Sequence, residues 1–135
     1  MKVLVDTCVW SLALRRNSPM ESPYVVELRD LITEFRVQMM GPVRQELLSG
    51  VRSPSQFKTL RGRFRAFPDL ELVSADFELA AEFFNTCRGH GVQGSNTDFL
   101  ICAAAERRKL PILTTDGDFL LFQKYIPVVL HPPRI

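Results

Sequence analysis

Four acidic residues stand where their carboxylates could perform chemistry. Asp6 and Asp116 each follow a short apolar run. Asp98 opens a strongly apolar segment, and Glu46 lies inside a short predicted helix. In a parallel α/β domain, the carboxyl ends of strands and the neighbouring helix starts line one crevice. Carboxylates gathered there repel one another and desolvate poorly unless a hard divalent cation sits among them. Because Mg²⁺ and Mn²⁺ favour oxygen ligands, the first hypothesis is a metal-dependent phosphodiester enzyme.

Each acid also has an ordinary structural explanation. Asp6 could cap the helix that follows it, and Asp116 could belong to a turn. Glu46 could be an exposed helical residue, although no Lys or Arg follows it at the spacing of an intrahelical ion pair. Ser95 and Asp98 have the spacing of a capping box, a role that is compatible with facing a cleft. The joint placement of the four acids, rather than any one of them, favours the metal site.

The elements that must position these acids can be read from the apolar pattern. Short apolar runs predict strands at 2–5, 36–40, 70–73, 111–114 and 128–130. Apolar residues at three- and four-residue spacing predict helices at 7–14, 23–35, 42–50, 54–66, 74–88, 95–109 and 117–125. The break at 17–19 ends the first helix, Pro42 and Gly50 mark the ends of the third, and Ser74 is the predicted cap of the fifth. This alternation indicates a parallel sheet covered on both faces.

Length and composition indicate one globular domain over residues 1–135. Apolar residues make up 46% of the chain and charged residues 24%, which is ordinary for a folded domain. Three widely spaced cysteines without a CxxC pair argue against a zinc site and for a reducing compartment. The N-terminus has no signal-peptide pattern, and no run approaches the ~18 apolar residues of a membrane span. We therefore expect a soluble cytoplasmic protein without a membrane partner.

Basic residues gather in one segment. The net charge of +2 alone does not indicate nucleic-acid binding. Between residues 50 and 68, however, there are no acids and five basic residues: Arg52, Lys58, Arg61, Arg63 and Arg65. Smaller basic clusters lie at 107–109 and 15–16. Each cluster is explained either as solvated surface or as a rim that holds the phosphates of a polyanion such as RNA.

Other catalytic chemistries find little support. The chain has no GxSxG, P-loop or GxGxxG segment, and neither histidine has an evident serine or cysteine partner. His90 lies between glycines, which is typical of an exposed loop. Trp10 and Cys102 lie among apolar residues, so we expect both in the core.

Four segments together resemble the PIN-domain ribonucleases, and among them the VapC toxins of bacterial toxin–antitoxin pairs. These segments are Val-Leu-Val-Asp-Thr at 3–7, Gln-Glu-Leu at 45–47, Thr-Asp-Phe-Leu-Ile-Cys-Ala-Ala-Ala at 97–105 and Ile-Leu-Thr-Thr-Asp-Gly-Asp-Phe at 112–119. Each motif is short, but the four occur in order over almost the whole chain. The resemblance implies a three-layer α/β/α sandwich with a short central parallel sheet, and an endoribonuclease that inhibits translation. It also implies a Mg²⁺ or Mn²⁺ cofactor, a homodimer and a cognate antitoxin that blocks the site.

Carried over by position, Asp6, Glu46, Asp98 and Asp116 correspond to the catalytic and metal-binding acids of that family. Thr115 matches a hydroxyl position near the metal, and Asp118 a less regular additional acid. The chain departs from the family at Cys8, where serine or asparagine is common, and this puts an auxiliary polar contact in doubt.

Two other functions stay open. The first is a non-catalytic module that binds protein or RNA, in which the acids are only caps and surface charges. The second is a metal-dependent phosphatase or phosphoryl-transfer domain, which is disfavoured because Cys8 and Ser53 stand where such enzymes have acids. The amphipathic helices at 23–35 and 54–67 either contact a partner or simply cover the sheet.

Overall fold

A computed structural model describes residues 1–15 and 22–134 of the chain. Its centre is a parallel sheet of three short strands: β1 (Val3–Val5), β2 (Val37–Gln38) and β3 (Ile112–Leu113). The strand order is β2-β1-β3, with Val3 opposite Val37 and Leu4 opposite Ile112. The central strand is β1, so its carboxyl end has neighbours on both sides.

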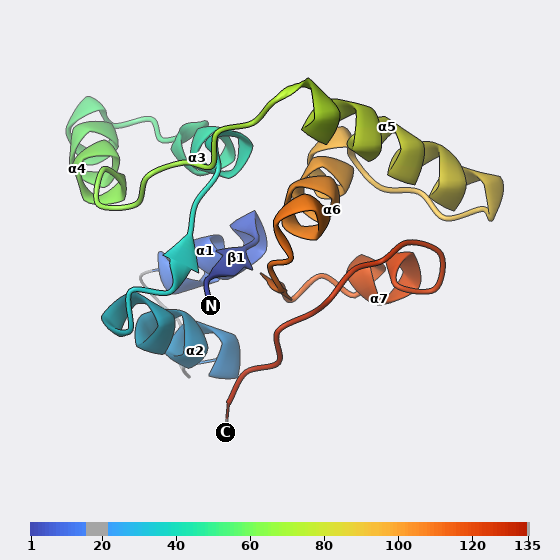
Figure 1. Cartoon of the computed structure of the whole chain (residues 1–135). Coiled ribbons are helices and arrows are strands. Elements are labelled where there is room, and N and C mark those ends of the chain that lie inside the picture. Colours follow the sequence, from blue (N-terminus) through green and yellow to red (C-terminus); the bar gives the residue numbers. More distant parts are fainter. Residues whose placement is uncertain (16–21, 135) are drawn as a thin grey trace.

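Seven helices surround this sheet in the described part of the chain (Figure 1). They are α1 (Thr7–Ala13), α2 (Pro23–Thr33), α3 (Gly41–Leu48), α4 (Pro54–Phe64), α5 (Ser74–Gly89), α6 (Asn96–Arg108) and α7 (Asp118–Phe122). In Figure 1, α2 lies on one side of the sheet, while α5 and α6 lie together on the other. The predicted α/β architecture is confirmed, and every predicted helix is present with ends that differ by a few residues.

Two predicted strands are wrong. The segments 70–73 and 128–130 form no strand. One isolated parallel bridge joins Met39 to Asp69, the residue before the first segment, and another joins Ile112 to Leu130 in the second. The physical reason is the shortness of β2 and β3, since a two-residue strand leaves its outer neighbour room for only a bridge. The segments still run along the sheet edges, where Leu70 N–H donates to the Met39 carbonyl at 3.0 Å.

Two helix ends are informative. The third helix, α3, ends at Leu48 with Ser49 as its C-cap, so Gly50 lies one residue further from the helix than predicted. Gly50 has a φ of 84°, the left-handed conformation that glycine adopts without strain. The predicted cap Ser74 is instead the first residue of α5, and Val73 is the N-cap. The reason is Asp76, whose carboxylate accepts a 2.9 Å hydrogen bond from Val73 N–H and so fixes the start of the helix one residue earlier than predicted. The predicted break at 17–19 and the basic residue Arg16 lie outside the described residues.

The core joins the sheet to α6. All three residues of β1 are fully buried, and α6 is buried without interruption from Phe99 to Ala105. Trp10 and Cys102 are buried, as predicted. Burying each large apolar side chain contributes roughly 1.5–3 kcal/mol, so this core holds the start of α6 firmly. No helix among the described residues is long and apolar enough to cross a membrane.

Two buried acids join elements that lie far apart in sequence. Asp76 at the start of α5 is fully buried and accepts hydrogen bonds from Arg107 and Arg108 at the end of α6, each at 2.7 Å. Glu27 of α2 is also fully buried, and it binds His131 at 2.5 Å and Arg134 at 3.0 Å. The basic cluster at 107–109 therefore has a structural role, since Lys109 also pairs with Glu106.

Candidate active site

Asp6 is the best-anchored of the candidate site residues. It follows β1 directly, and its backbone N–H donates to the Leu113 carbonyl at 2.9 Å. Its Oδ1 accepts from Thr7 N–H at 2.7 Å, which caps α1. Its Oδ2 accepts a 2.8 Å hydrogen bond from the Thr114 hydroxyl. The side chain is only 6% exposed, so backbone and side-chain contacts together set the direction of this carboxylate.

Thr114 is a site residue that the sequence analysis missed. Its hydroxyl donates to Asp6 and also accepts the Asp116 backbone N–H at 3.0 Å, so one side chain links two of the candidate acids. The family resemblance implies a hydroxyl near the metal at Thr115, whose side chain is exposed, and that role stays a prediction. The available signal was the polar residue at 114, which continues a buried run that is otherwise apolar.

Cys8 makes the polar contact that its departure from the family pattern had put in doubt. Its Sγ lies 3.3 Å from Oδ2 of Asp6 and 3.3 Å from the Thr114 hydroxyl. It also accepts the Thr115 backbone N–H at 3.4 Å. The thiol therefore completes a small network around one carboxylate oxygen.

Asp98 has the capping role that the sequence pattern suggested. Its Oδ2 accepts from Ser95 N–H at 3.1 Å, and its own N–H donates to the Ser95 hydroxyl at 3.0 Å. The side chain is nevertheless half-buried. Burial raises the pKa of Asp98, and the negative charges of Asp116 and Asp118 raise it further. Capping and a place in the acidic cluster thus coexist in one residue.

The charges of the acids act on one another. Burial is the main cause that raises the pKa of Asp6, hydrogen bonds from Thr114, Cys8 and Thr7 oppose it, and the charge of Asp98 adds to it. Asp116 is half-buried, and its Oδ1 accepts the Asp118 N–H at 2.9 Å. Asp118 itself is exposed in the first turn of α7.

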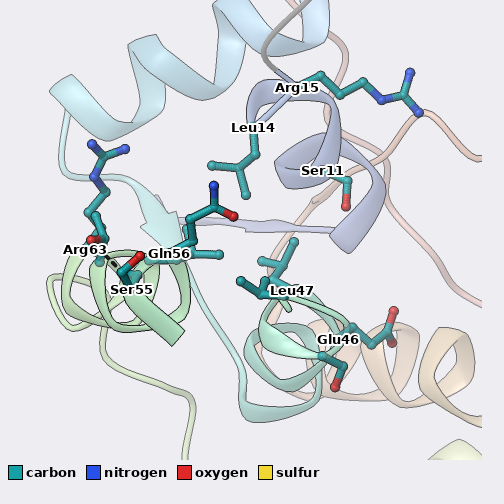
Figure 2. Close-up of a pocket in the computed structure, with 12 residues that line it drawn as sticks. Ser11, Leu14, Arg15, Glu46, Leu47, Ser55, Gln56 and Arg63 are labelled. Atoms are coloured by element: carbon teal, nitrogen blue, oxygen red, sulfur yellow. Dashed lines mark hydrogen bonds between the residues drawn. The ribbon is translucent and has the colours of Figure 1, made fainter. Parts of the chain in front are cut away.

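Glu46 stands apart from this network. It lies on the exposed face of α3, and its carboxylate has no hydrogen-bond partner among the described residues. It lines a hollow of about 620 Å³ between α1, α3 and α4 (Figure 2). It also lines a smaller hollow of about 420 Å³ that reaches Thr97, the residue before Asp98. Glu46 and Ser49 therefore line both hollows, and the smaller hollow continues from them to α6.

The donor set suits a hard divalent cation in type and charge. No described Lys or Arg forms an ion pair with Asp6, Asp98 or Asp116. The buried Thr7 hydroxyl beside Asp6 also has no partner among the described residues. A bound cation would relieve the mutual repulsion of the Asp6, Asp98 and Asp116 carboxylates and offset the cost of burying their charges. Among the described residues, no three His, Cys, Asp or Glu side chains form a ready-made ion site.

The five basic residues predicted to bind RNA are all exposed on or beside α4. Only Arg63 among them lines the larger hollow, where Arg15 from the end of α1 also lies. Arg61 instead lies over the ring of Phe57, with its guanidinium carbon 5.7 Å from the ring centroid. Arg63 therefore differs from the other four basic residues of the segment in that it lines the larger hollow.

The chain is similar to proteins of a known family. A family model described as PIN domain matches residues 3–124. Over 122 residues the chain is 33% identical to the VapC ribonuclease Mb1587 of Mycobacterium bovis and to the ribonuclease VapC11 of Mycobacterium tuberculosis, which covers 87% of this chain and 88% of each relative.

Solved structures agree with this fold. The crystal structure of FitAcB from Neisseria gonorrhoeae matches with a TM-score of 0.77 and 22% identity over 97% of both chains. The VapBC2 structure from Rickettsia felis, bound to a DNA fragment from its promoter, matches with a TM-score of 0.77 and 16% identity, covering 97% of this chain and 98% of that one.

Proposed function

The chain belongs to the PIN-domain family, among the VapC ribonucleases, and on that premise we propose that it is a metal-dependent endoribonuclease. The observation that carries the proposal is Asp6, a buried carboxylate at the carboxyl end of the central strand. Burial and the charge of Asp98 both raise the pKa of Asp6, and no described basic side chain neutralises it. A site that concentrates negative charge without a protein counter-ion suits a divalent cation.

Asp6, Asp98 and Asp116 would hold Mg²⁺ or Mn²⁺. When bound, the cation lowers the pKa of a water and polarises the scissile phosphate, so hydrolysis needs no protein nucleophile. Thr114, Cys8 and Thr7 orient the Asp6 carboxylate. Ser95 orients Asp98 through the capping box.

The remaining candidates have supporting roles. The unpaired carboxylate of Glu46 is available to orient a water at the site. Asp118 supplies an additional carboxylate, whereas the exposed Thr115 contributes through its backbone. Arg63, the basic residue of α4 that lines the larger hollow, would hold an RNA phosphate, a contact that supplies affinity rather than sequence choice.

We further propose that the chain is the toxin of a toxin–antitoxin pair. Its relatives are named VapC ribonucleases, and its structural neighbours include a toxin–antitoxin complex from Klebsiella pneumoniae. A protein antitoxin would block the acidic site, and release would let the enzyme cleave RNA in the cytoplasm and inhibit translation. We expect one catalytic domain per chain over residues 1–135 and assembly as a homodimer.

A non-catalytic binding module is the second candidate. One observation favours it: both Asp6 and Asp98 cap helices, and the described acids do not converge into a ready metal site. A module of this kind would bind RNA or protein without cleaving it and would gain no stability from Mn²⁺.

The deciding experiment is cleavage of purified tRNA, rRNA and mRNA by antitoxin-free protein in Mg²⁺, in Mn²⁺ and in EDTA. Asp6→Asn is the inactive variant, and Asp30→Asn, on the exposed face of α2, is the matched control. Discrete fragments that require metal and Asp6 would support the nuclease. Intact RNA with every metal would favour the binding module.

A further inference from the structure

A large hollow lies beside the cluster of Asp6, Asp98 and Asp116 rather than in it. Its volume is about 620 Å³, within the range of ~300–1,000 Å³ typical of small-ligand sites. Helices α1, α3 and α4 each contribute lining residues (Figure 2). Of the four candidate acids, Glu46 lines it and Asp6, Asp98 and Asp116 do not, so the catalytic proposal leaves the wall formed by α1 and α4 unexplained.

The hollow combines polar groups that have no partner with an apolar wall. Among the described residues, the side chains of Gln56, Ser11 and Arg63 make no hydrogen bond or ion pair. Figure 2 shows the Gln56 amide reaching from α4 toward Leu14 at the end of α1. Leu14 is 40% exposed, and Leu47 adds further apolar surface. An amide beside apolar side chains can hydrogen-bond the edge of a flat heterocycle whose face rests on the apolar wall.

Other polar side chains of the hollow are already occupied. The Thr59 hydroxyl donates to the Ser55 carbonyl at 3.0 Å, and the Ser49 hydroxyl donates to the Gln45 carbonyl at 2.7 Å. Gln56 and Ser11 therefore keep both a donor and an acceptor available, and Gln56 presents them side by side on one planar amide.

The hollow continues toward the candidate active site. Glu46 lines it and also lines the smaller hollow that contains Thr97, next to Asp98. A chain molecule seated in the larger hollow would thus pass Glu46 to reach the carboxylates. At the side of the hollow away from Glu46 in Figure 2, Arg63 supplies a positive charge suited to phosphate.

We propose that this hollow binds one unpaired nucleotide of single-stranded RNA adjacent to the cleaved bond. Gln56 reads the edge of the base, and Arg63 binds the phosphate next to it. This inference rests on the proposed ribonuclease function and adds a specificity-determining residue to it. It also distinguishes Arg63 from Arg61, whose guanidinium lies over Phe57.

Binding is measured first, independently of cleavage. Fluorescence anisotropy follows labelled eight-nucleotide single-stranded RNA binding to the Asp6→Asn protein in EDTA. Adding Arg63→Gln should weaken binding about five- to tenfold at low salt and lower the slope of affinity against salt by about one. Arg61→Gln, on the same helix with the same charge change, should alter binding less than about twofold. Equal effects of the two variants would overturn the phosphate assignment.

Base preference is measured next, by sequencing the ends produced from an RNA library of random sequence. Wild type should prefer one base at a position flanking the cut by about fivefold or more, the discrimination of one good amide–base contact. Gln56→Ala should lower that preference below about twofold while metal-dependent cleavage persists. An unchanged preference would overturn the proposal.

These outcomes are separable from failure of the nuclease itself. RNA left intact by wild type refutes the proposed function, yet the binding comparison of Arg63→Gln with Arg61→Gln still tests the hollow. If the Arg63→Gln variant still binds RNA but no longer binds a purified antitoxin, the hollow is a protein-docking site and the proposal is wrong. Gln56 and Arg63 are exposed, so unchanged melting temperatures should confirm that their variants fold.

Discussion

The hydroxyl of Thr114 donates a 2.8 Å hydrogen bond to Oδ2 of Asp6, a contact that joins residues 108 positions apart. Both residues lie just beyond the carboxyl ends of adjacent parallel strands, β1 and β3. The contact is buried, and it supports the carboxylate on which the proposed chemistry depends. Replacing Thr114 should therefore lower the rate of catalysis through its effect on Asp6, although Thr114 is not itself one of the proposed catalytic acids.

Replacing Thr114 with Val keeps the shape of the side chain and removes the donor to Asp6. We expect kcat for RNA cleavage to fall about 10- to 100-fold, the usual cost of losing a group that orients a metal ligand. Thr115→Val is the matched control, because the neighbouring side chain is exposed. Equal losses in the two variants would mean that the contact with Asp6 does not matter for cleavage.

Cys8 should act through its contact with Asp6. Cys8→Ser keeps a hydroxyl donor at that position, so we expect cleavage within about threefold of wild type, whereas Cys8→Ala should lose about tenfold. The loss should appear in kcat with little change in KM, since Cys8 is a positioning residue. If Ser and Ala behave alike, the thiol only fills space beside Asp6.

The Asp98 carboxylate should lower the stability of the metal-free protein and contribute to metal binding. Burial and the charges of Asp116 and Asp118 disfavour its ionised form, so Asp98→Asn should raise the metal-free melting temperature at pH 7 by about 2–4 °C. Mn²⁺ should stabilise wild type but not this variant. Thermal unfolding with and without Mn²⁺ tests both statements, with Asp30→Asn as the control. A variant that Mn²⁺ stabilises as much as wild type would remove Asp98 from the metal site.

Asp76 should be a main stabiliser of the α5–α6 pair. Asp76→Asn should lower the free energy of unfolding by about 1–3 kcal/mol, less than for a fully enclosed ion pair because Arg107 and Arg108 reach solvent. Glu78→Gln, an exposed change on the same helix, should have little effect. Denaturant unfolding at neutral pH measures the difference.

The same pair predicts a pH dependence. The hydrogen bond from Arg108 outweighs burial and, with Val73 N–H and Arg107, holds the pKa of Asp76 below its ordinary value of 3.8. A lowered folded-state pKa stabilises the protein above the unfolded value, and the contribution is lost as pH falls through the folded value. The difference in the free energy of unfolding between wild type and Asp76→Asn should therefore stay constant from pH 8 to 5 and become smaller below pH 3.8. If this difference in free energy became smaller only at alkaline pH, ionised Asp76 would not be the source of the stabilisation.

Local features of this chain were legible in its sequence. Apolar spacing predicted all seven helices because helix formation depends on contacts three and four residues apart. The Ser95–Asp98 capping box was predicted for the same reason, and the end of α3 was predicted to within two residues. The acids that follow β1 and β3 were recognised because a parallel sheet brings its carboxyl ends to one edge.

Features that depend on pairing between distant segments were not legible. Whether 70–73 and 128–130 become strands depends on the length of the neighbouring strands. Only one isolated bridge forms beside the first segment, at Asp69, and one in the second, at Leu130. The choice between Thr114 and Thr115 depends on register, because successive side chains beyond a strand point to opposite faces. Likewise, only packing of α4 beside α1 and α3 brings Arg63 into the hollow and leaves Arg61 on Phe57. Sequence spacing specifies which residues share an element, whereas the direction of each side chain follows from the element packed against it.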